Sequence, residues 1–118
     1  MQPITELGPD EVFVFGSNAD GAHAAGAART AADRFGAVWG EGDGLQGQSY
    51  AIDTMSGATV VADRVAAFLR FADEHPELRF LVTPIGTGIA GHAAHEVAPL
   101  FAAAPPNVVL PGEFSTLL

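Results

Sequence analysis

The chain twice places a short apolar run directly before a glycine-rich loop and then an alanine-rich helical pattern. The two units span residues 12–28 and 80–91. A glycine lets the main chain approach an anion with no Cβ in the way, and the first N–H groups of a helix have no partner within that helix. A strand followed by a glycine-rich loop and the start of a helix is therefore an arrangement that can bind phosphate. Two such loops could bind a diphosphate from two sides.

Apolar periodicity predicts strands that alternate with helices. Short apolar runs bounded by turn residues indicate buried strands, and apolar residues at three- and four-residue spacing indicate helices. The predicted strands cover residues 11–15, 49–54, 79–83 and 108–110, with an edge strand near Ile4; the predicted helices cover 26–35, 59–74 and 93–104; residues 39–48 form a predicted surface loop. This alternation predicts an α/β fold with a mostly parallel sheet that receives ligands at the carboxyl ends of its strands.

Length and charge narrow the classes of function. The chain has 118 residues, the length of one domain, and we expect residues 1–118 to share one fold. The formal net charge is −9, from 5 Lys and Arg residues against 14 Asp and Glu residues. Such a field repels a nucleic-acid backbone, so we expect no binding of DNA or RNA. A small anion is compatible with this charge if oriented main-chain N–H groups hold it.

Features that the sequence lacks exclude further classes of protein and of site. Cysteine is absent, which excludes disulfides, thiolate metal sites and cysteine nucleophiles. No apolar run approaches the ~20 residues of a membrane span, and the amino end shows no basic segment followed by an apolar one. We therefore expect a cytoplasmic protein without membrane contact. The sequence indicates no cofactor and predicts no oligomeric state.

Polar side chains follow the first predicted strand. Asn18 comes directly after Gly16 and Ser17, where its amide would meet a sugar hydroxyl; the alternative is an Asx turn. His23 and Asp20 lie in the same loop and are candidates for a general base, Asp20 either activating water or orienting the imidazole. The alternative for both is a solvated loop residue.

The second glycine loop, residues 86–91, matches neither of two common phosphate motifs. It lacks the Gly-Lys-Ser/Thr of a P-loop, and no acidic ribose partner follows at the spacing of a dinucleotide fold. Its Thr87 hydroxyl and successive N–H groups would form an anion nest. The alternative is a glycine turn without a ligand.

Two histidines and one aromatic residue complete the candidates. His92 and His95 lie one turn apart before Glu96, but two histidines without a third strong ligand predict no metal site. His92 is instead a candidate to close over a phosphate. Phe114 follows the last predicted strand and is either a lid on a base or part of the core.

The order of these motifs resembles the macrodomain, the ADP-ribose-binding module. The resemblance covers most of the chain and rests on Ile4-Thr5-Glu6-Leu7, Val14-Phe15-Gly16-Ser17-Asn18, Gly26-Ala27-Ala28, Tyr50-Ala51-Ile52-Asp53-Thr54 and Ile85-Gly86-Thr87-Gly88-Ile89-Ala90-Gly91. It implies a compact three-layer α/β/α fold with a mostly parallel mixed sheet. It also implies ADP-ribose, or an ADP-ribosylated substrate, as the partner.

Site residues follow from the resemblance position by position. Asn18 matches the family's asparagine that faces the distal ribose, residues 21–27 match the first ligand loop, and residues 86–91 match the loop around the diphosphate. The expected ligand-binding residues are Gly16, Ser17, Asn18, Gly21, Gly26, Ala27, Gly86, Thr87, Gly88, Ile89, Ala90, Gly91, His92 and Phe114.

Three departures from the family pattern bear on activity. Pro3 stands where many members have an adenine-binding aspartate, and Ala25 and Ala90 stand where hydrolytic members have acidic residues. Ala90 also replaces the usual aromatic residue of the second loop. The predicted function is therefore binding of ADP-ribose or a related nucleotide diphosphate. The same prediction includes hydrolysis of an ADP-ribosyl linkage, with Asn18, His23 and Asp20 as the candidate catalytic residues. A reader without turnover and a phage-derived assembly protein with vestigial loops are the alternatives.

Overall fold

The computed structural model describes residues 4–23, 25–88 and 90–118. In chain order its elements are β1 (Glu11–Ser17), α1 (Gly26–Arg34), β2 (Gly44–Gln46), β3 (Ser49–Asp53), α2 (Ala58–Glu74), β4 (Arg79–Val82), α3 (Ala94–Val97), the 3-10 helix η1 (Ala98–Phe101), β5 (Val108–Val109) and α4 (Gly112–Ser115). The alternation of strands and helices confirms the predicted α/β fold.

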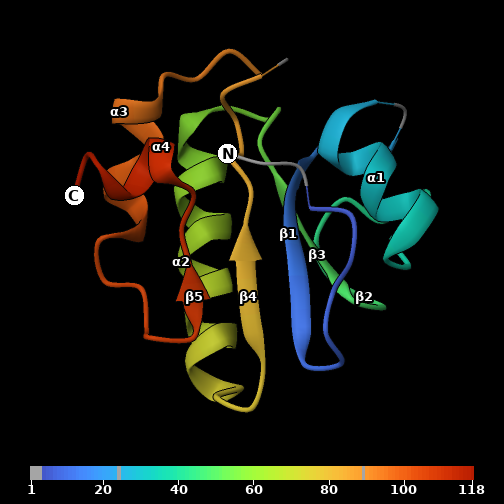
Figure 1. Ribbon diagram of the computed structural model, residues 1–118. Helices are drawn as coiled ribbons and strands as arrows, with labels where there is room; N and C mark the ends of the chain where they lie inside the picture. The colour runs from blue at the N-terminus through green and yellow to red at the C-terminus, as the bar shows by residue number, and fades with distance from the viewer. Residues whose placement is uncertain (1–3, 24, 89) are drawn as a thin grey trace.

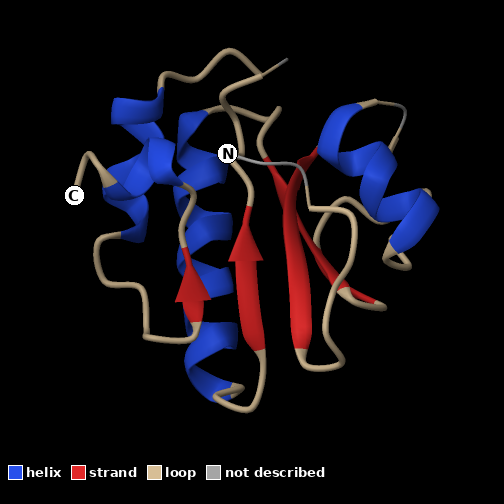
Figure 2. Cartoon of the chain, in the orientation of Figure 1, coloured by secondary structure: helices blue, strands red, loops and turns tan. Residues whose placement is uncertain are grey.

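The described strands form a five-stranded mixed sheet in the order β2-β3-β1-β4-β5. Strand β1 pairs in parallel with β3 on one side and with β4 on the other, and β5 extends the parallel set beyond β4. Only the short edge strand β2 is antiparallel, to β3. Figure 2 shows the arrowheads of β4 and β5 pointing the same way. The mostly parallel sheet predicted from the sequence is confirmed.

Side chains of β1 alternate between two apolar cores because successive residues of a strand face opposite sides of a sheet. Val12 and Val14 belong to the larger core, to which α2 and the three C-terminal helical segments contribute. Phe13 and Phe15 belong to the smaller core, which α1 covers. In Figure 1, α1 lies apart from the other helices. Strand β1 is thus buried on both sides, as its continuous apolar run predicted.

The region predicted as one helix over residues 93–104 is instead two short helical segments, α3 and η1. Pro99 stands at the start of η1, and proline has no N–H to continue the α-helical hydrogen-bond pattern. The predicted loop over residues 39–48 contains the strand β2, which a tight turn at Gly47, with a φ of +58°, pairs with β3. The segment around Ile4 is not a strand.

The carboxyl end of α2 depends on a residue far along the chain. The side-chain amide of Asn107 donates to the carbonyl oxygens of Ala72, His75 and Leu78, at distances from Nδ2 of 2.9, 3.0 and 3.1 Å. This side chain therefore joins the last turn of α2 to the turn that leads into β4, and it is a second donor to Ala72 O, which also accepts from His75 N.

Phe68 lies in the larger core, and its substitution tests the packing of that core. Its side chain is fully buried, and its ring lies 5.0 Å from that of Tyr50 and 5.4 Å from that of Phe80. We expect Phe68→Ala to lower the free energy of unfolding by about 3–5 kcal/mol, because it removes buried apolar area and leaves a cavity. Denaturant unfolding followed by Trp39 fluorescence measures this. Leu45→Ala, on the exposed side of β2, is the control, and equal losses would contradict the assignment of the core.

Tyr50 gives the protein a titration that is simple to assign. Burial raises the pKa of its phenol above its ordinary value near 10, and the charge of Asp43 adds to the effect. The stability that the neutral phenol contributes is fully present below pH ~10 and is lost as the pH rises through the higher pKa of the folded protein. The sequence has one tyrosine and no lysine, and arginine stays charged in this range.

We therefore expect Tyr50→Phe to change stability at pH 7 by less than about 1 kcal/mol and to flatten the loss of stability at alkaline pH. Denaturant midpoints measured at pH 8 to 11, together with the phenolate absorbance of the folded protein, check this. An identical alkaline slope in both proteins would assign the loss to another group.

Candidate ligand-binding site

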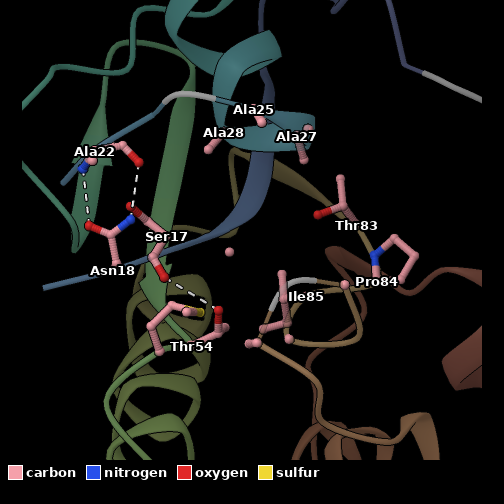
Figure 3. Close-up of a pocket in the computed structure, with 16 residues that line it drawn as sticks. Ser17, Asn18, Ala22, Ala25, Ala27, Ala28, Thr54, Thr83, Pro84 and Ile85 are labelled. Carbon is pink, nitrogen blue, oxygen red and sulfur yellow. Dashed lines mark hydrogen bonds between the residues drawn. The ribbon is translucent and has the colours of Figure 1, made fainter.

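A cavity of about 460 Å³ opens at the carboxyl ends of β1, β3 and β4 (Figure 3). Its volume is in the usual range of small-molecule sites, about 300–1,000 Å³. The described lining residues are Gly16, Ser17, Asn18, Ala22, Ala25, Gly26, Ala27, Ala28, Thr54, Met55, Thr83, Pro84, Ile85, Gly86, Gly88 and Ala90. The N-cap Ala25 and the first three residues of α1 are among them, so a helix N-terminus forms one wall.

The two glycine loops line this one cavity. Figure 3 shows Ala27 and Ala28 of the first unit facing Thr83, Pro84 and Ile85 of the second across the open space. Parallel pairing of β1 with β4 explains this, because it brings the loops that follow the two strands to the same edge of the sheet.

The predicted site residues divide into three groups. Gly16, Ser17, Asn18, Gly26, Ala27, Gly86, Gly88 and Ala90 line the cavity. Asp20, Gly21, His23, Thr87, Gly91, His92 and Phe114 are not among its described lining residues. Ile89 lies outside the described residues, as does Pro3.

The N-terminus of α1 has open donors. The first backbone bond of its first turn runs from Arg29 N to Ala25 O at 3.3 Å, and no side chain caps the helix at Ala25. The amides of Gly26 and Ala27, which precede that bond, therefore have no partner within the helix. Both residues line the cavity, where their N–H groups and the helix dipole favour an anion.

Asn18 closes its own loop. Its Oδ1 accepts from Ala22 N and its Nδ2 donates to Ala22 O, both at 3.0 Å. These bonds lie within the loop, but they reach four residues on and are not the bond of an Asx turn, which is made two residues on. Asn18 still lines the cavity, so this loop also forms part of the wall.

His23 is fully buried, whereas Asp20 is exposed. The imidazole Nε2 lies 2.9 Å from the Val38 carbonyl oxygen, and Nδ1 lies 3.4 Å from Ser17 Oγ. His23 is not among the described lining residues of the cavity, whereas Ser17, which its ring contacts, is one of them. No described contact joins Asp20 to His23, and the predicted pairing of these two residues is not present.

Phe114 is a core residue. Its side chain is fully buried, and its ring stacks on that of Phe101 at 5.7 Å. Of the two roles that the sequence allowed, the structure places it in the core and not over a ligand.

The second loop uses several polar groups to hold its own shape. The Thr87 hydroxyl donates to Pro84 O at 2.8 Å, and the amide of Gly91 donates to Gly88 O at 3.0 Å. The predicted nest of Thr87 with successive free amides is therefore not formed as expected. His92 ties the loop to the sheet, since its Nε2 donates to Thr54 O at 2.9 Å.

The first loop packs against residues 40–42 at main-chain distance. Gly21 has a φ of +64°, and an added Cβ there would overlap the main chain of Gly40 and Glu41. An added Cβ on Gly42 would overlap Asn18 O. Only glycine permits this approach, which keeps the first loop in place beside the cavity.

The described wall of the cavity carries no charged side chain. Its hydroxyl groups are partly used, since Thr83 Oγ1 donates to Val14 O at 2.8 Å and Thr54 Oγ1 to Ser17 O at 3.3 Å. An anion in this cavity would therefore be held by main-chain N–H groups. Sequence reasoning missed Thr54, Met55 and Thr83 as lining residues, although their place at the carboxyl ends of predicted parallel strands would have identified them.

Two searches of the described residues found nothing. No group of three or more His, Asp or Glu side chains has the arrangement to hold a metal ion. Within the same part of the chain, no helix has the length and apolar character that crossing a bilayer requires.

Comparisons with protein-family models, with curated proteins and with solved structures found no match.

The close approach at Gly21 predicts a difference between two glycine substitutions. Gly21→Ala and Gly44→Ala both place alanine at positive φ, +64° and +90°, which costs about 1–2 kcal/mol. Only Gly21→Ala also forces a Cβ into neighbouring main chain, which adds about 1–3 kcal/mol; at Gly44 the space is open. Denaturant unfolding of both variants measures the difference, and equal losses would mean that the contact with residues 40–42 is absent in solution.

Proposed function

We propose that this protein binds ADP-ribose or a related nucleotide diphosphate in the cavity between its two glycine loops. The observation that carries the proposal is that two loops distant in the sequence line one cavity together with the open N-terminus of α1. Main-chain N–H groups at this helix end hold the diphosphate. The glycines of the opposite loop let the ligand approach the main chain, since an added Cβ on Gly88 would meet only open space.

The charge of the protein is consistent with such a ligand. Although the net charge is −9, no acidic side chain is among the described residues of the wall, so repulsion is not focused on the cavity. The dipole of α1 acts within its first turn, where the cavity lies.

The proposed activity is binding without cleavage of the glycosidic linkage. No carboxylate or imidazole is among the described lining residues, so none is placed to activate water beside a bound ribose. This favours a reader over an ADP-ribosyl hydrolase.

A charge introduced at the cavity wall tests the proposal. Glutamate in the first turn of a helix favours the helix by about 0.3–1 kcal/mol, so Ala27→Glu keeps the fold while placing an anion where the diphosphate would bind. We expect titration calorimetry to show ADP-ribose binding to the wild type and at least tenfold weaker binding to Ala27→Glu, about 1.4 kcal/mol or more.

Ala27→Gln is the matched control because it adds similar bulk without charge. ADP-ribose, ADP and adenosine, titrated in turn, separate the contribution of the diphosphate from that of the base. No heat with millimolar ADP-ribose, or equal affinities of the two variants, would refute the proposal.

A further inference from the structure

The most unusual polar contact of the described chain joins Ser17 to His23. Ser17 Oγ lies 3.4 Å from Nδ1 of the imidazole, and Nε2 of the same ring lies 2.9 Å from the carbonyl oxygen of Val38. A carbonyl oxygen only accepts hydrogen bonds, so Nε2 carries the proton of the neutral ring. Nδ1 is then left as an acceptor and faces the Ser17 hydroxyl.

The surroundings of His23 hold the ring in this orientation. The imidazole is fully buried, with the Phe15 ring edge-on at 5.3 Å and the Trp39 ring tilted against it at 5.9 Å. A serine hydroxyl facing an imidazole, with the imidazole oriented by a third group, is the arrangement of an activated nucleophile. Here the third group is the Val38 carbonyl.

Ser17 connects this pair to the cavity. It is the last residue of β1, it lines the cavity, and its exposed fraction is 5%. Its main chain is fixed, since its carbonyl oxygen accepts from Thr54 N at 3.0 Å. The open amides of Gly26 and Ala27 belong to the same wall, and N–H groups of this kind stabilise an oxyanion that forms beside a nucleophile.

We propose that Ser17 is a nucleophile and His23 its general base, and that the pair hydrolyses carboxylic esters small enough to enter the cavity. This activity goes beyond nucleotide binding and does not depend on it. It also gives the buried imidazole a chemical role, because its Nδ1 faces the hydroxyl of a residue that lines the cavity. The separation of 3.4 Å between Oγ and Nδ1 is longer than a strong hydrogen bond, as is common in such pairs before substrate binds.

The reaction consumes one water and needs no other reactant. Ser17 Oγ bonds to the ester carbonyl carbon while its proton moves to His23 Nδ1. The bond from that carbon to the leaving oxygen then breaks, and the leaving alkoxide takes the proton from Nδ1. Water attacks the acyl-serine, gives its proton to Nδ1, and the carboxylic acid leaves as Ser17 Oγ recovers that proton.

The first experiment follows acylation of the full-length protein by an aryl acetate. We expect release of the phenolate, an added acetyl group in the intact mass, and peptide mapping that places the acetyl group on Ser17. Ser17→Ala lowers the rate at least a hundredfold, whereas Ser115→Ala, at an exposed serine of α4, leaves it unchanged. No acetylation of the folded wild type, or acetylation that persists in Ser17→Ala, overturns the proposal.

The second experiment uses the absence of cysteine from the sequence. Ser17→Cys and Ser115→Cys each introduce a single thiol, and the pH dependence of its alkylation reports how the neighbouring ring affects it. A histidine partner lowers the pKa of a thiol from about 8.5. We expect the alkylation midpoint of Ser17→Cys to lie at least one pH unit below that of Ser115→Cys.

Adding His23→Gln to Ser17→Cys should remove that shift. If His23→Gln does not fold, the comparison of the two single thiols still decides: equal midpoints, or a thiol in Ser17→Cys that no alkylating agent reaches, would refute a nucleophile at this position.

ADP-ribose distinguishes this proposal from the proposed function. If both hold, ADP-ribose slows the acetylation of Ser17 because the two ligands share the cavity. If ADP-ribose leaves the acetylation unchanged and gives no heat of binding, the proposed nucleotide binding is refuted and the proposed nucleophile stands. If ADP-ribose binds in calorimetry but Ser17 is not acetylated, the nucleotide binding stands and the nucleophile is refuted.

Discussion

Parallel pairing of β1 with both β3 and β4 is the constraint on which the rest of the structure depends. It makes β1 a central strand, and the alternation of its side chains places Val14 in one core and Phe15 in the other. It also brings three strand ends to one edge of the sheet, and the loops that follow those strands form the walls of one cavity. The location of the cavity thus follows from the parallel direction of these strands.

The wall of the cavity consists largely of alanine and glycine residues, which are hard to recognise as binding residues in a sequence. Alanine and glycine side chains offer no chemistry, yet they leave the main chain open, and the uncapped start of α1 makes that main chain an electrostatic feature. A protein with a net charge of −9 thereby presents an uncharged, mostly apolar wall at this place, with main-chain N–H groups at the start of α1. The proposed diphosphate binding depends on this local field.

Burial changes the role that His23 can have in the site. In the sequence it is a histidine in a glycine-rich loop, and the natural expectation is a base that acts directly on a ligand. In the structure two aromatic rings pack against it and two oxygens contact its two nitrogens, and one of those oxygens belongs to Ser17, which lines the cavity. The loop of residues 36–41 supplies Val38 and Trp39 to this arrangement, a contribution that no local pattern indicates.

The sequence alone determined the α/β alternation, the mostly parallel sheet and the two loops, because apolar periodicity and glycine placement act over short distances along the chain. The tertiary structure decided what depends on distant residues. It placed Phe114 in the core, closed the Asn18 side chain on Ala22, and enclosed His23 between Phe15 and Trp39. The break at Pro99 was visible in the sequence as a missing N–H, whereas the bonds from Asn107 to the end of α2 join residues about 30 positions apart and exist only once the chain is packed.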